Sequence, residues 1–299
     1  MPICTGVELN PSALFCVLAL CCTALAAQAG PVLKERSNFI WSRPDAWFGG
    51  FSGAEVSSYG NEIALVGDRG RVVTANIERE NGAITGINII RSVALRGRDG
   101  SVLRDKQTDA EGLAISDNGR AFVSLEHSHR VVSLDIRTGR TRPMKPHKDF
   151  RRFQINAGLE ALMLHPDGTL FTLPEESETP TRAFPLYALR DGNWQVSARI
   201  PRRGPFLPVG GDFDESGQLY LLERTVTPLG FRSRIRRFDF ARNGLVEQTL
   251  LRTLPGRFDN LEALSVWQDA KGQTQLTLVS DDNFLPIQRT QIVEFAVTE

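Results

Sequence analysis

One short phrase built around a carboxylate recurs five times along the 299 residues of this chain. Successive copies of the carboxylate are separated by 56, 49, 52 and 50 residues, so the period stays close to 50. A fixed period of this length indicates one supersecondary unit that is repeated and buries its apolar faces against its neighbours. The five carboxylates are Glu55, Glu111, Glu160, Asp212 and Glu262.

Each repeat has the same internal order, in which an apolar run, a polar turn and a second apolar run follow the acid. In the third repeat, the turn at 165–168 (His-Pro-Asp-Gly) separates Ala161–Leu164 from Thr169–Leu173. Asp-Gly or Asn-Gly between two short β-rich runs is typical of a hairpin. A second acid follows the second run in every repeat: Asp68, Glu126, Glu175, Glu223 and Asp281.

Further β-rich runs follow each hairpin, and none shows helical periodicity. The third runs are 72–77, 130–136, 184–189, 234–240 and 291–297, and weaker fourth runs include 84–95 and 194–199. Three or four antiparallel strands per unit of about 50 residues are typical of a β-propeller blade. The sequence therefore predicts an all-β chain that folds as a β-propeller.

The number of blades follows from the two ends of the chain. The fifth repeat starts near residue 260 and is too short to supply a full blade, whereas Asn38–Trp41 has no blade of its own. We expect this N-terminal segment to add the missing outer strand, so that the N- and C-terminal strands close a ring of five blades. A six-bladed ring is the alternative, with a degenerate blade hidden in 96–108 or 141–157.

The N-terminal segment predicts a secretory signal peptide over residues 1–29, followed by a single domain over 30–299. Residues 11–29 are apolar and end in Ala27-Gln28-Ala29, a small-x-small cleavage pattern. This places the protein in the periplasm or outside the cell. All four cysteines, at 4, 16, 21 and 22, lie in this segment, so the mature domain would hold no disulfide.

The charge of the chain excludes some partners. The formal net charge is zero, which provides no general attraction to nucleic acid or to an anionic membrane. We expect a small-molecule ester or phosphate as the partner and no membrane association after the signal is removed; the sequence leaves the oligomeric state open.

The repeat predicts where the carboxylates gather. The first strand of each propeller blade lines the central channel, and the far end of the second strand lies beside the start of the first. Both sets of acids should therefore converge on one face, where they cannot all stay ionised without partners. The partners are either arginines, for which Arg69, Arg130, Arg224, Arg234 and Arg289 are candidates, or a bound cation.

Oxygen ligands without cysteine favour a hard cation, and an irregular cage of six to eight oxygens favours Ca²⁺ over Mg²⁺. The predicted cofactor is therefore calcium. Its predicted ligands are Glu55, Glu111, Glu160, Asp212, Glu262 and Asp281.

Several blocks also resemble a known family, the phytase-like domain proteins, described as "esterase-like activity of phytase". The similar blocks are 125–130 (LEHSHR), 222–224 (LER), 259–264 (DNLEAL) and, most specifically, 280–284 (SDDNF) with 288–290 (QRT). The resemblance runs from about Gly49 to the C-terminus. It implies a secreted bacterial β-propeller with phosphoesterase activity but brings no defined catalytic set.

The first functional hypothesis is a metal-dependent phosphoesterase, because phosphoryl transfer depends mainly on charge neutralisation. Arginines would hold the phosphate oxygens, and His127 or His129 would move a proton. Exposed loop histidines are the competing interpretation. The candidate catalytic residues are Glu126, His127, Arg130, Arg224 and Asp282.

Two other functions stay open. A calcium-dependent lactonase-type ester hydrolase would use a few Glu, Asp and Asn side chains, and Asn260 and Asn283 fit that pattern. A non-catalytic periplasmic binding scaffold is the third hypothesis, because a fold does not settle a function. A serine hydrolase is disfavoured because the chain has no Gly-x-Ser-x-Gly motif.

Overall fold

The structure is a computed structural model that describes Met1 and residues 30–154, 158–177, 179, 181–241 and 244–299. The predicted signal peptide lies outside the described residues, apart from Met1. Pro31–Glu299 forms one compact unit. Within the described residues, no helix has the length and apolarity needed to cross a membrane.

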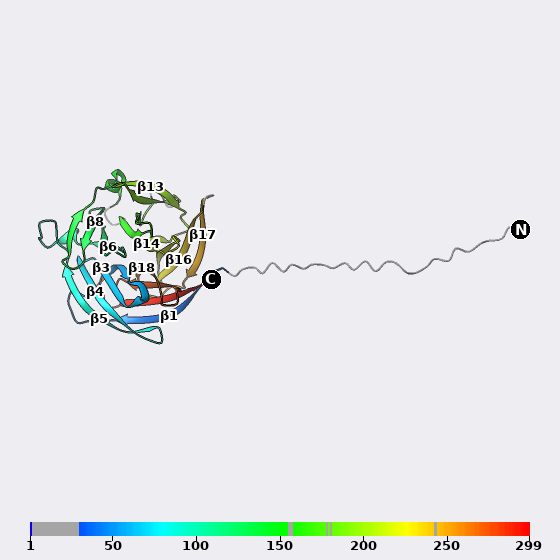
Figure 1. Ribbon diagram of the computed structural model, residues 1–299, viewed down its shortest axis with the longest axis horizontal. Coiled ribbons are helices and arrows are strands. Elements are labelled where there is room, and N and C mark those ends of the chain that lie inside the picture. The colour runs from blue at the N-terminus through cyan, green and yellow to red at the C-terminus, as the bar shows by residue number, and fades with distance from the viewer. Residues whose placement is uncertain (2–29, 155–157, 178, 180, 242–243) are drawn as a thin grey trace. The chain divides into compact units, whose positions relative to one another are not determined.

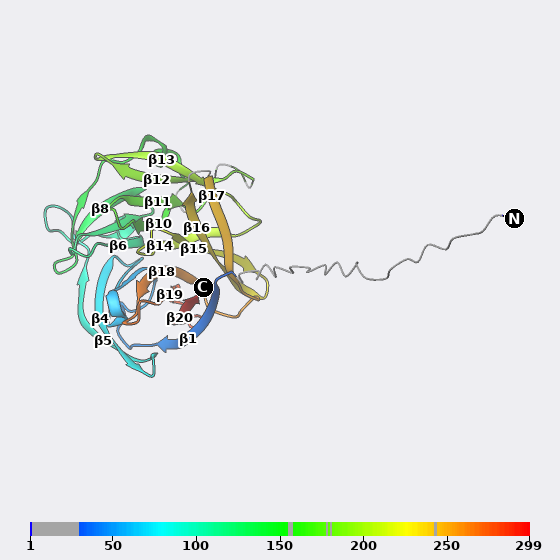
Figure 2. The same ribbon diagram turned by 45° about the vertical axis from the view of Figure 1, so that its right-hand side comes forward.

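Five four-stranded antiparallel sheets stand around one axis like the blades of a propeller (Figures 1 and 2). This confirms the five-bladed prediction. Blade I is β2 (Phe51–Val56), β3 (Glu62–Gly67), β4 (Arg71–Glu80) and β5 (Ala83–Ala94); blade II is β6 (Ala110–Ile115), β7 (Ala121–Leu125), β8 (Arg130–Asp135) and β9 (Arg140–Pro143). Blade III is β10 (Leu159–Leu164), β11 (Leu170–Pro174), β12 (Phe184–Arg190) and β13 (Asn193–Ile200); blade IV is β14 (Leu207–Phe213), β15 (Leu219–Thr227), β16 (Gly230–Ala241) and β17 (Gly244–Arg252).

Blade V combines both ends of the chain. It consists of β18 (Leu261–Gln268), β19 (Thr274–Ser280), β20 (Thr290–Thr298) and, as outer strand, β1 (Val32–Trp41). Strand β1 pairs antiparallel with β20 from Val32 opposite Thr298 to Trp41 opposite Thr290. The predicted closure of the ring by the two terminal strands is therefore confirmed.

The two segments considered for a sixth blade have other structures. Residues 96–108 form a loop with a short 3₁₀ turn, Asp105–Gln107. The described part of 141–157 contains the end of β9 and the 3₁₀ turn Lys148–Arg152.

Five apolar clusters hold the ring together, one at each boundary between neighbouring blades. Phe51 of blade I stacks on Trp41 of blade V in one cluster, and Leu186 of blade III and Phe238 of blade IV belong to another. Burial of such a side chain stabilises the fold by roughly 1.5–3 kcal/mol. Since every blade shares its core with two others, the ring is stable as a unit and its inner strands are held in fixed positions.

The inner strands β2, β6, β10, β14 and β18 approach one another so closely that one position holds only glycine or alanine. A Cβ atom on Gly112 would lie 2.8 Å from the Leu162 backbone nitrogen of the next blade, and one on Gly210 would lie 2.3 Å from the Glu262 carbonyl oxygen. The corresponding residues are small in every blade: Gly53, Gly112, Ala161, Gly210 and Ala263. The channel wall is therefore backbone packed on backbone at this level.

Candidate active site

A bulge at the start of the inner strands sets the first group of carboxylates. Pairing with the second strand skips one residue in four blades, namely Ser52, Glu160, Val209 and Glu262, and shifts over Glu111–Gly112 in blade II. Bulges re-aim the side chain of the extra residue. Each skipped residue directly precedes the small residue of its strand, so the equivalent residues of the five blades are Ser52, Glu111, Glu160, Val209 and Glu262.

The expectation of five acids at one level is therefore wrong for two of them. Glu55 and Asp212 lie three residues further along β2 and β14 than the bulge positions Ser52 and Val209. They form a deeper pair. Glu55 accepts a hydrogen bond from the Ile115 backbone N–H (3.2 Å), and Asp212 accepts one from the Val266 backbone N–H (2.7 Å). Each therefore ties its own blade to the inner strand of the next.

Burial raises the pKa of Glu55 well above its ordinary value, and the charge of Asp212 adds to that rise. Burial also raises the pKa of Asp212 to about 7. Ser265 donates a further hydrogen bond to Glu55 (3.1 Å). Glu55 and Asp212 accept hydrogen bonds from backbone N–H groups of neighbouring inner strands, so we assign them a structural role.

The second acids lie where the sequence predicts in four of the five blades. Asp68, Glu126, Glu175 and Asp281 each follow the last residue of the second strand. In all four, the backbone N–H donates to the carbonyl of the residue before the inner strand at 3.0 Å. This repeated bond places the second acid beside the first at the mouth of the channel.

Blade IV departs from this pattern, because the residue at the equivalent position is Arg224. Arg224 pairs with Leu207 in the ladder and Glu223 pairs with Pro208, one residue too early for the acid position. The Glu223 side chain is fully buried within the blade and ion pairs with Arg234 and Arg236. Glu223 is thus not part of the channel mouth, contrary to the expectation from the repeat.

Eight carboxylates gather at the mouth, and we refer to them as the acid cluster. They are Asp68, Asp109, Glu111, Glu126, Glu160, Glu175, Glu262 and Asp281. Asp109 was missed among the sequence candidates, although it lies two residues before Glu111 in the repeated phrase. Ser52 joins the cluster by donating to Asp68 (3.2 Å) or Glu262 (3.1 Å).

The acid cluster holds its protons more tightly than free carboxylic acids do. Burial, reinforced by the charge of Glu262, raises the pKa of Asp68 to about 7 and that of Asp281 to about 8. Burial followed by neighbouring carboxylates raises the pKa of Glu111 and Glu160 well above their ordinary values. Burial also raises the pKa of Glu126. These shifts reflect crowded negative charge that a cation would relieve.

Arg224 is the guanidinium that the described structure brings into the acid cluster. It ion pairs with Glu262 of blade V and with Glu175 of blade III (3.2 Å), and it donates to the Asn260 side-chain oxygen (2.6 Å). Asn260 in turn donates to Glu262 (2.9 Å). Burial raises the pKa of Glu175 to about 7 even though Arg224 opposes the shift. One arginine therefore balances only part of the cluster.

The other arginines expected as partners have different contacts. Arg69 stacks over the Phe284 ring at 3.3 Å, and Arg234 pairs with Glu223 inside blade IV. The buried Nε of Arg130 has no hydrogen-bond partner among the described residues. Arg289 bonds to Asp259 through its backbone N–H (2.9 Å). Among described residues, Arg224 and His127 make the ion pairs to the acid cluster.

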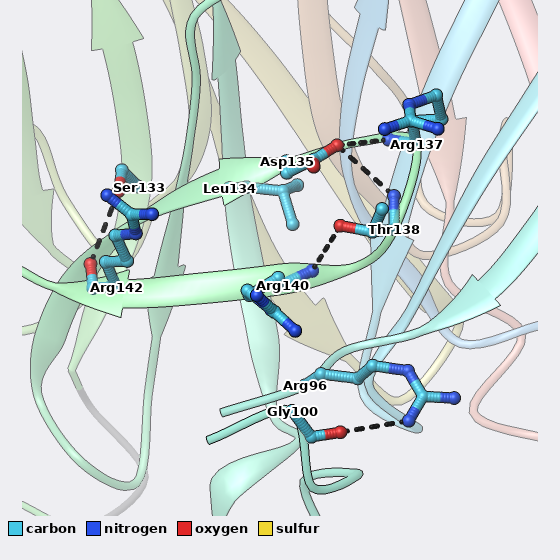
Figure 3. Close-up of a pocket in the computed structure, with 9 residues that line it drawn as sticks. All are labelled: Arg96, Gly100, Ser133, Leu134, Asp135, Arg137, Thr138, Arg140 and Arg142. Atoms are coloured by element: carbon cyan, nitrogen blue, oxygen red, sulfur yellow. Dashed lines mark hydrogen bonds between the residues drawn. The ribbon is translucent and has the colours of Figure 1, made fainter. Parts of the chain in front are cut away.

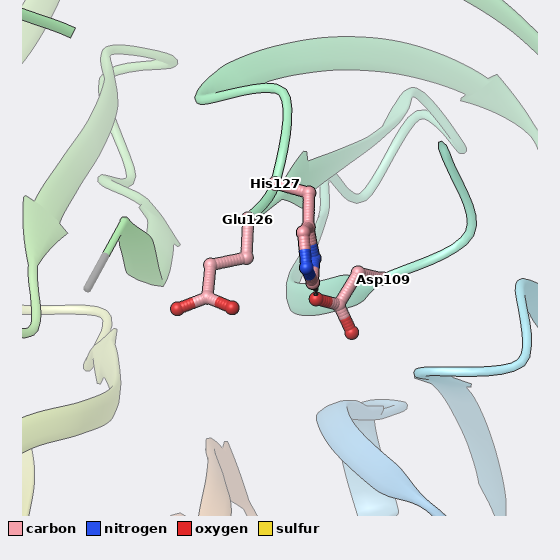
Figure 4. A group of neighbouring side chains, drawn as sticks. All are labelled: Asp109, Glu126 and His127. Atoms are coloured by element: carbon pink, nitrogen blue, oxygen red, sulfur yellow. Dashed lines mark hydrogen bonds and ion pairs between the residues drawn. The ribbon is translucent and has the colours of Figure 1, made fainter. Parts of the chain in front are cut away.

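His127 and Asp109 form a hydrogen-bonded pair on one side of the cluster, with Glu126 next to them (Figure 4). Because the Asp109 carboxylate accepts, the His127 Nδ1 donates, and the opposite ring nitrogen, Nε2, has no hydrogen bond within the described residues. His129 differs: its ring packs edge-on against Phe153, and burial lowers its pKa. His127 is thus the histidine that the structure orients at the mouth.

Asp282, a candidate catalytic residue, has a structural set of contacts instead. Its carboxylate accepts hydrogen bonds from the backbone N–H groups of Gly50 (3.0 Å) and Phe284 (3.1 Å) and from the Thr290 hydroxyl (3.0 Å). These bonds hold the loop before β2 against the turn that follows β19. We therefore place Asp282 outside the acid cluster.

The cluster suits a hard cation. Two groups of side chains could each hold a cation, because the ligand atoms within each group lie within 4.8 Å of one another. One group is Asp109, Glu126 and His127, and the other is Asp68, Asp109 and Glu111. Carboxylate oxygens dominate both sets, which is the donor chemistry of Ca²⁺. Of the six predicted ligands, Glu111, Glu160, Glu262 and Asp281 lie in the cluster, whereas Glu55 and Asp212 do not.

Comparison with solved structures adds only a likeness of fold. An aldose sugar dehydrogenase from Streptomyces coelicolor, solved with bound PQQ, is 12% identical over 90% of this chain and 100% of that chain, with a TM-score of 0.49. A virginiamycin B lyase from Staphylococcus aureus is 11% identical over the same shares, with a TM-score of 0.44. At these values we infer nothing about function from either protein. No curated protein sequence matches significantly.

The family comparison is decisive, because it covers most of the chain and all of the acid cluster. The Phytase-like family, described as "Esterase-like activity of phytase", matches residues 46–284. Every blade contributes to the matched region. The resemblance read from the short sequence blocks is thereby confirmed, and the chain belongs to the Phytase-like family.

Proposed function

We propose that the chain is a calcium-dependent hydrolase of phosphate esters that acts at the acid cluster. The observation that carries this proposal is the crowding of eight carboxylates around one arginine, with raised pKa values at six of them. Such a site gains stability from a divalent cation, and phosphoryl transfer is promoted by neutralising charge.

Asp109 is the centre of the proposed cation site, because it belongs to both sets of nearby ligand atoms. Asp68 and Glu111, which form the all-carboxylate set with Asp109, would supply the remaining protein oxygens. A bound Ca²⁺ would polarise a phosphate oxygen and lower the pKa of a coordinated water. Arg224, on the opposite side, would contact a phosphate oxygen through the part of its guanidinium that Glu262 and Glu175 leave free.

His127 and Glu126 are the proton-transfer candidates. Asp109 fixes the ring of His127 through Nδ1, which leaves Nε2 to donate to the leaving oxygen of the ester. Burial raises the pKa of Glu126, which brings this carboxyl toward the range where a general acid or base works near neutral pH. Both residues follow directly on β7, so the strand sets their positions.

The test is metal analysis of the purified protein together with a panel of phosphate and carboxylate esters. We expect bound calcium and turnover of a phosphate ester that a chelator abolishes. Glu111→Gln, which removes one charge and has no arginine partner to release, should lose both. Glu62→Gln, at an exposed position of β3, is the matched control and should lose neither. Calcium-independent turnover in the wild-type protein would refute the proposal.

Asn260 favours a second candidate, a calcium-dependent lactonase-type ester hydrolase. Its side chain is buried and bonded to both Glu262 and Arg224, so an amide oxygen stands among the carboxylates. Activity on lactones without activity on phosphate esters would select this alternative. Absence of both activities in calcium-loaded protein would leave the binding scaffold.

We also propose a periplasmic or secreted location and a small-molecule ester or phosphate as the partner. The support is the small-x-small pattern at 27–29 and the neutral net charge. Cell fractionation with N-terminal sequencing of the mature protein tests the location, and an N-terminus at Gly30 is expected.

A further inference from the structure

A basic pocket lies at the outer edge of blade II, away from the acid cluster. Four arginines line it: Arg96 from the loop after β5, Arg137 from the turn between β8 and β9, and Arg140 and Arg142 from β9. The cavity has a volume of about 710 Å³, well above that of a single phosphate and within the usual range of ligand sites. Figure 3 shows these side chains around the pocket, with Arg140 directed toward Arg96.

The direction of the strands separates this pocket from the channel mouth. Glu126 follows the end of β7, and β8 then runs away from the mouth to Asp135. Six residues of extended chain span roughly 20 Å. The pocket therefore belongs to the opposite end of blade II, and a ligand there would not touch the acid cluster.

Within the described residues, no ion pair joins the arginines of the pocket to a carboxylate, although the charge of Arg137 acts on Asp135. Arg96 donates to the Gly100 carbonyl oxygen (3.0 Å), and the structure shows no hydrogen bond from the guanidinium groups of Arg137, Arg140 or Arg142. The one carboxylate in the pocket, Asp135, accepts from the backbone N–H groups of Arg137 (2.9 Å) and Thr138 (3.2 Å). The pocket therefore keeps a net positive charge in a chain whose formal net charge is zero.

A second basic pocket of about 450 Å³ follows only three residues further along the chain. Lys145, Lys148 and Arg151 line it. Lys145 donates to Asn193 (2.8 Å), and the carboxylate nearby, Asp149, interacts with His147 at 3.3 Å. The lining of the first pocket ends at Arg142 and that of the second begins at Lys145, so only the end of β9 and one further residue separate them along the chain. Two pockets of the same charge suit an elongated anion better than a compact one.

The chemistry of the lining selects the class of anion. A planar carboxylate offers two oxygens and is satisfied by one or two guanidiniums, whereas a phosphate group presents more oxygens and accepts from several at once. Ser133 and Thr138 add hydroxyl groups, and no aromatic ring lines the arginine pocket, so a base has no surface to stack on in that pocket; Trp194 and His147 line only the second pocket. We propose that the outer edge of blade II binds a linear chain of phosphate groups, anchored in the arginine pocket. This site is independent of the proposed hydrolase function.

The test is calorimetric titration of the purified protein with inorganic tripolyphosphate and with long-chain inorganic polyphosphate, in 150 mM salt and in the presence of a chelator. The chelator removes any cation that could hold polyphosphate at the acid cluster. We expect both probes to bind, the long chain more tightly. Arg96→Ala combined with Arg140→Ala should weaken tripolyphosphate binding about tenfold or more and reduce the dependence on salt by about two released ions.

The matched control is Arg190→Ala combined with Arg252→Ala, which removes two exposed arginines that line neither pocket. It should change the affinity less than twofold. The four positions are exposed, so both variants are expected to keep the wild-type melting temperature; glutamine replaces alanine if one does not. Equal loss in the control, absence of binding in chelator, or equally tight binding of polygalacturonate would overturn the proposal.

Discussion

Arg224 ion pairs with Glu262 across the boundary between blades IV and V, in the position that a carboxylate occupies in every other blade. The ring is therefore not five equal units at its mouth. Four blades supply a second acid, and blade IV supplies the counter-charge. An internal guanidinium of this kind helps the cluster fold before a cation binds, because its single positive charge already lies between Glu175 and Glu262.

Replacing this guanidinium should separate folding from metal binding. Arg224→Met leaves Glu175 and Glu262 without a cationic partner, and loss of one member of a buried pair costs about 3–5 kcal/mol. Arg224 is 19% exposed, so we expect the lower end of that range in chelator and a much smaller loss in calcium. Chemical denaturation in both conditions measures the difference, and an equal loss in both would contradict the idea that a cation can substitute for Arg224.

The metal-free protein should lose stability as the pH rises. Asp68, Glu175 and Asp281 have folded pKa values of about 7, 7 and 8, above the values near 4 of the unfolded chain. A raised acid pKa means that the folded state binds more protons than the unfolded state. Proton binding therefore stabilises the fold fully below about pH 4, and this stabilisation is lost as the pH rises from about 4 to the folded pKa values of about 7 to 8. We expect the melting temperature in chelator to fall by about 5–10 °C between pH 5 and pH 8.

Calcium should cancel that fall, because a bound cation replaces the protons. Melting curves across the same pH range with and without calcium provide the comparison. A melting temperature that does not respond to pH in chelator would show that the cluster is not charged as described.

His127 should act as a general acid. His127→Gln keeps a side chain that can bond to Asp109 but removes the titratable nitrogen, and we expect kcat for an alkyl phosphate to fall about 100-fold or more. A 4-nitrophenyl ester has a leaving group that needs no proton, so its hydrolysis should suffer much less. His165→Gln, in the turn of blade III with Asp167 as partner, is the control. Equal losses with both esters would exclude the general-acid role.

The deeper pair should be structural and not metal-binding. Glu55→Gln retains an oxygen for the Ile115 N–H and removes the repulsion with Asp212. We expect calcium content to be unchanged and the free energy of unfolding at pH 8 to increase by about 1 kcal/mol, with a smaller change at pH 5, because the raised pKa of Glu55 favours the neutral carboxyl as the pH falls. Metal analysis and denaturation at the two pH values test this, and loss of calcium would return Glu55 to the set of ligands.

The close approach of the inner strands should make small residues essential beside the acids. Gly210→Ala would place a Cβ atom 2.3 Å from the Glu262 carbonyl oxygen, so β14 and β18 must move apart. Overpacking of this kind costs about 1–3 kcal/mol, and because Glu262 belongs to the acid cluster, calcium affinity should fall as well. Gly192→Ala, at a turn with open space around it, keeps the glycine-to-alanine change away from the channel and should leave calcium affinity at the wild-type value.

The blade count and the closing strand could be predicted because they depend on spacing alone, and spacing survives variation in individual residues. The level of each acid could not. The phrase around Glu55 resembles those around Glu111 and Glu160, yet the bulge in β2 places Ser52 at the equivalent position. A bulge inserts one extra residue into a strand, and no residue type identifies its position in the sequence. A one-residue change of register alters which side chains face the channel.

Gly53 indicates the equivalent position of the five repeats more reliably than Glu55 does. A residue that must be small because a neighbouring backbone lies against it varies less freely than a carboxylate that can act at two depths. The error at Glu223 has the same origin: the ladder of β15 runs through the position where the other second strands end, so counting from the strand end selected the wrong residue. Asp109 was overlooked because a single blade carries it.

The pairing of β1 with β20 has a consequence for the order in which the molecule assembles. Strand β1 has as its partner a strand that is synthesised about 250 residues later. Blades I to IV can each form from contiguous chain, but blade V is a three-stranded sheet with an open edge until β1 joins it. Since the joining of distant segments is the slow step of such topologies, we expect an intermediate with four complete blades, an exposed β20 edge and an unfinished acid cluster, and hence calcium binding that begins only when the circle is complete.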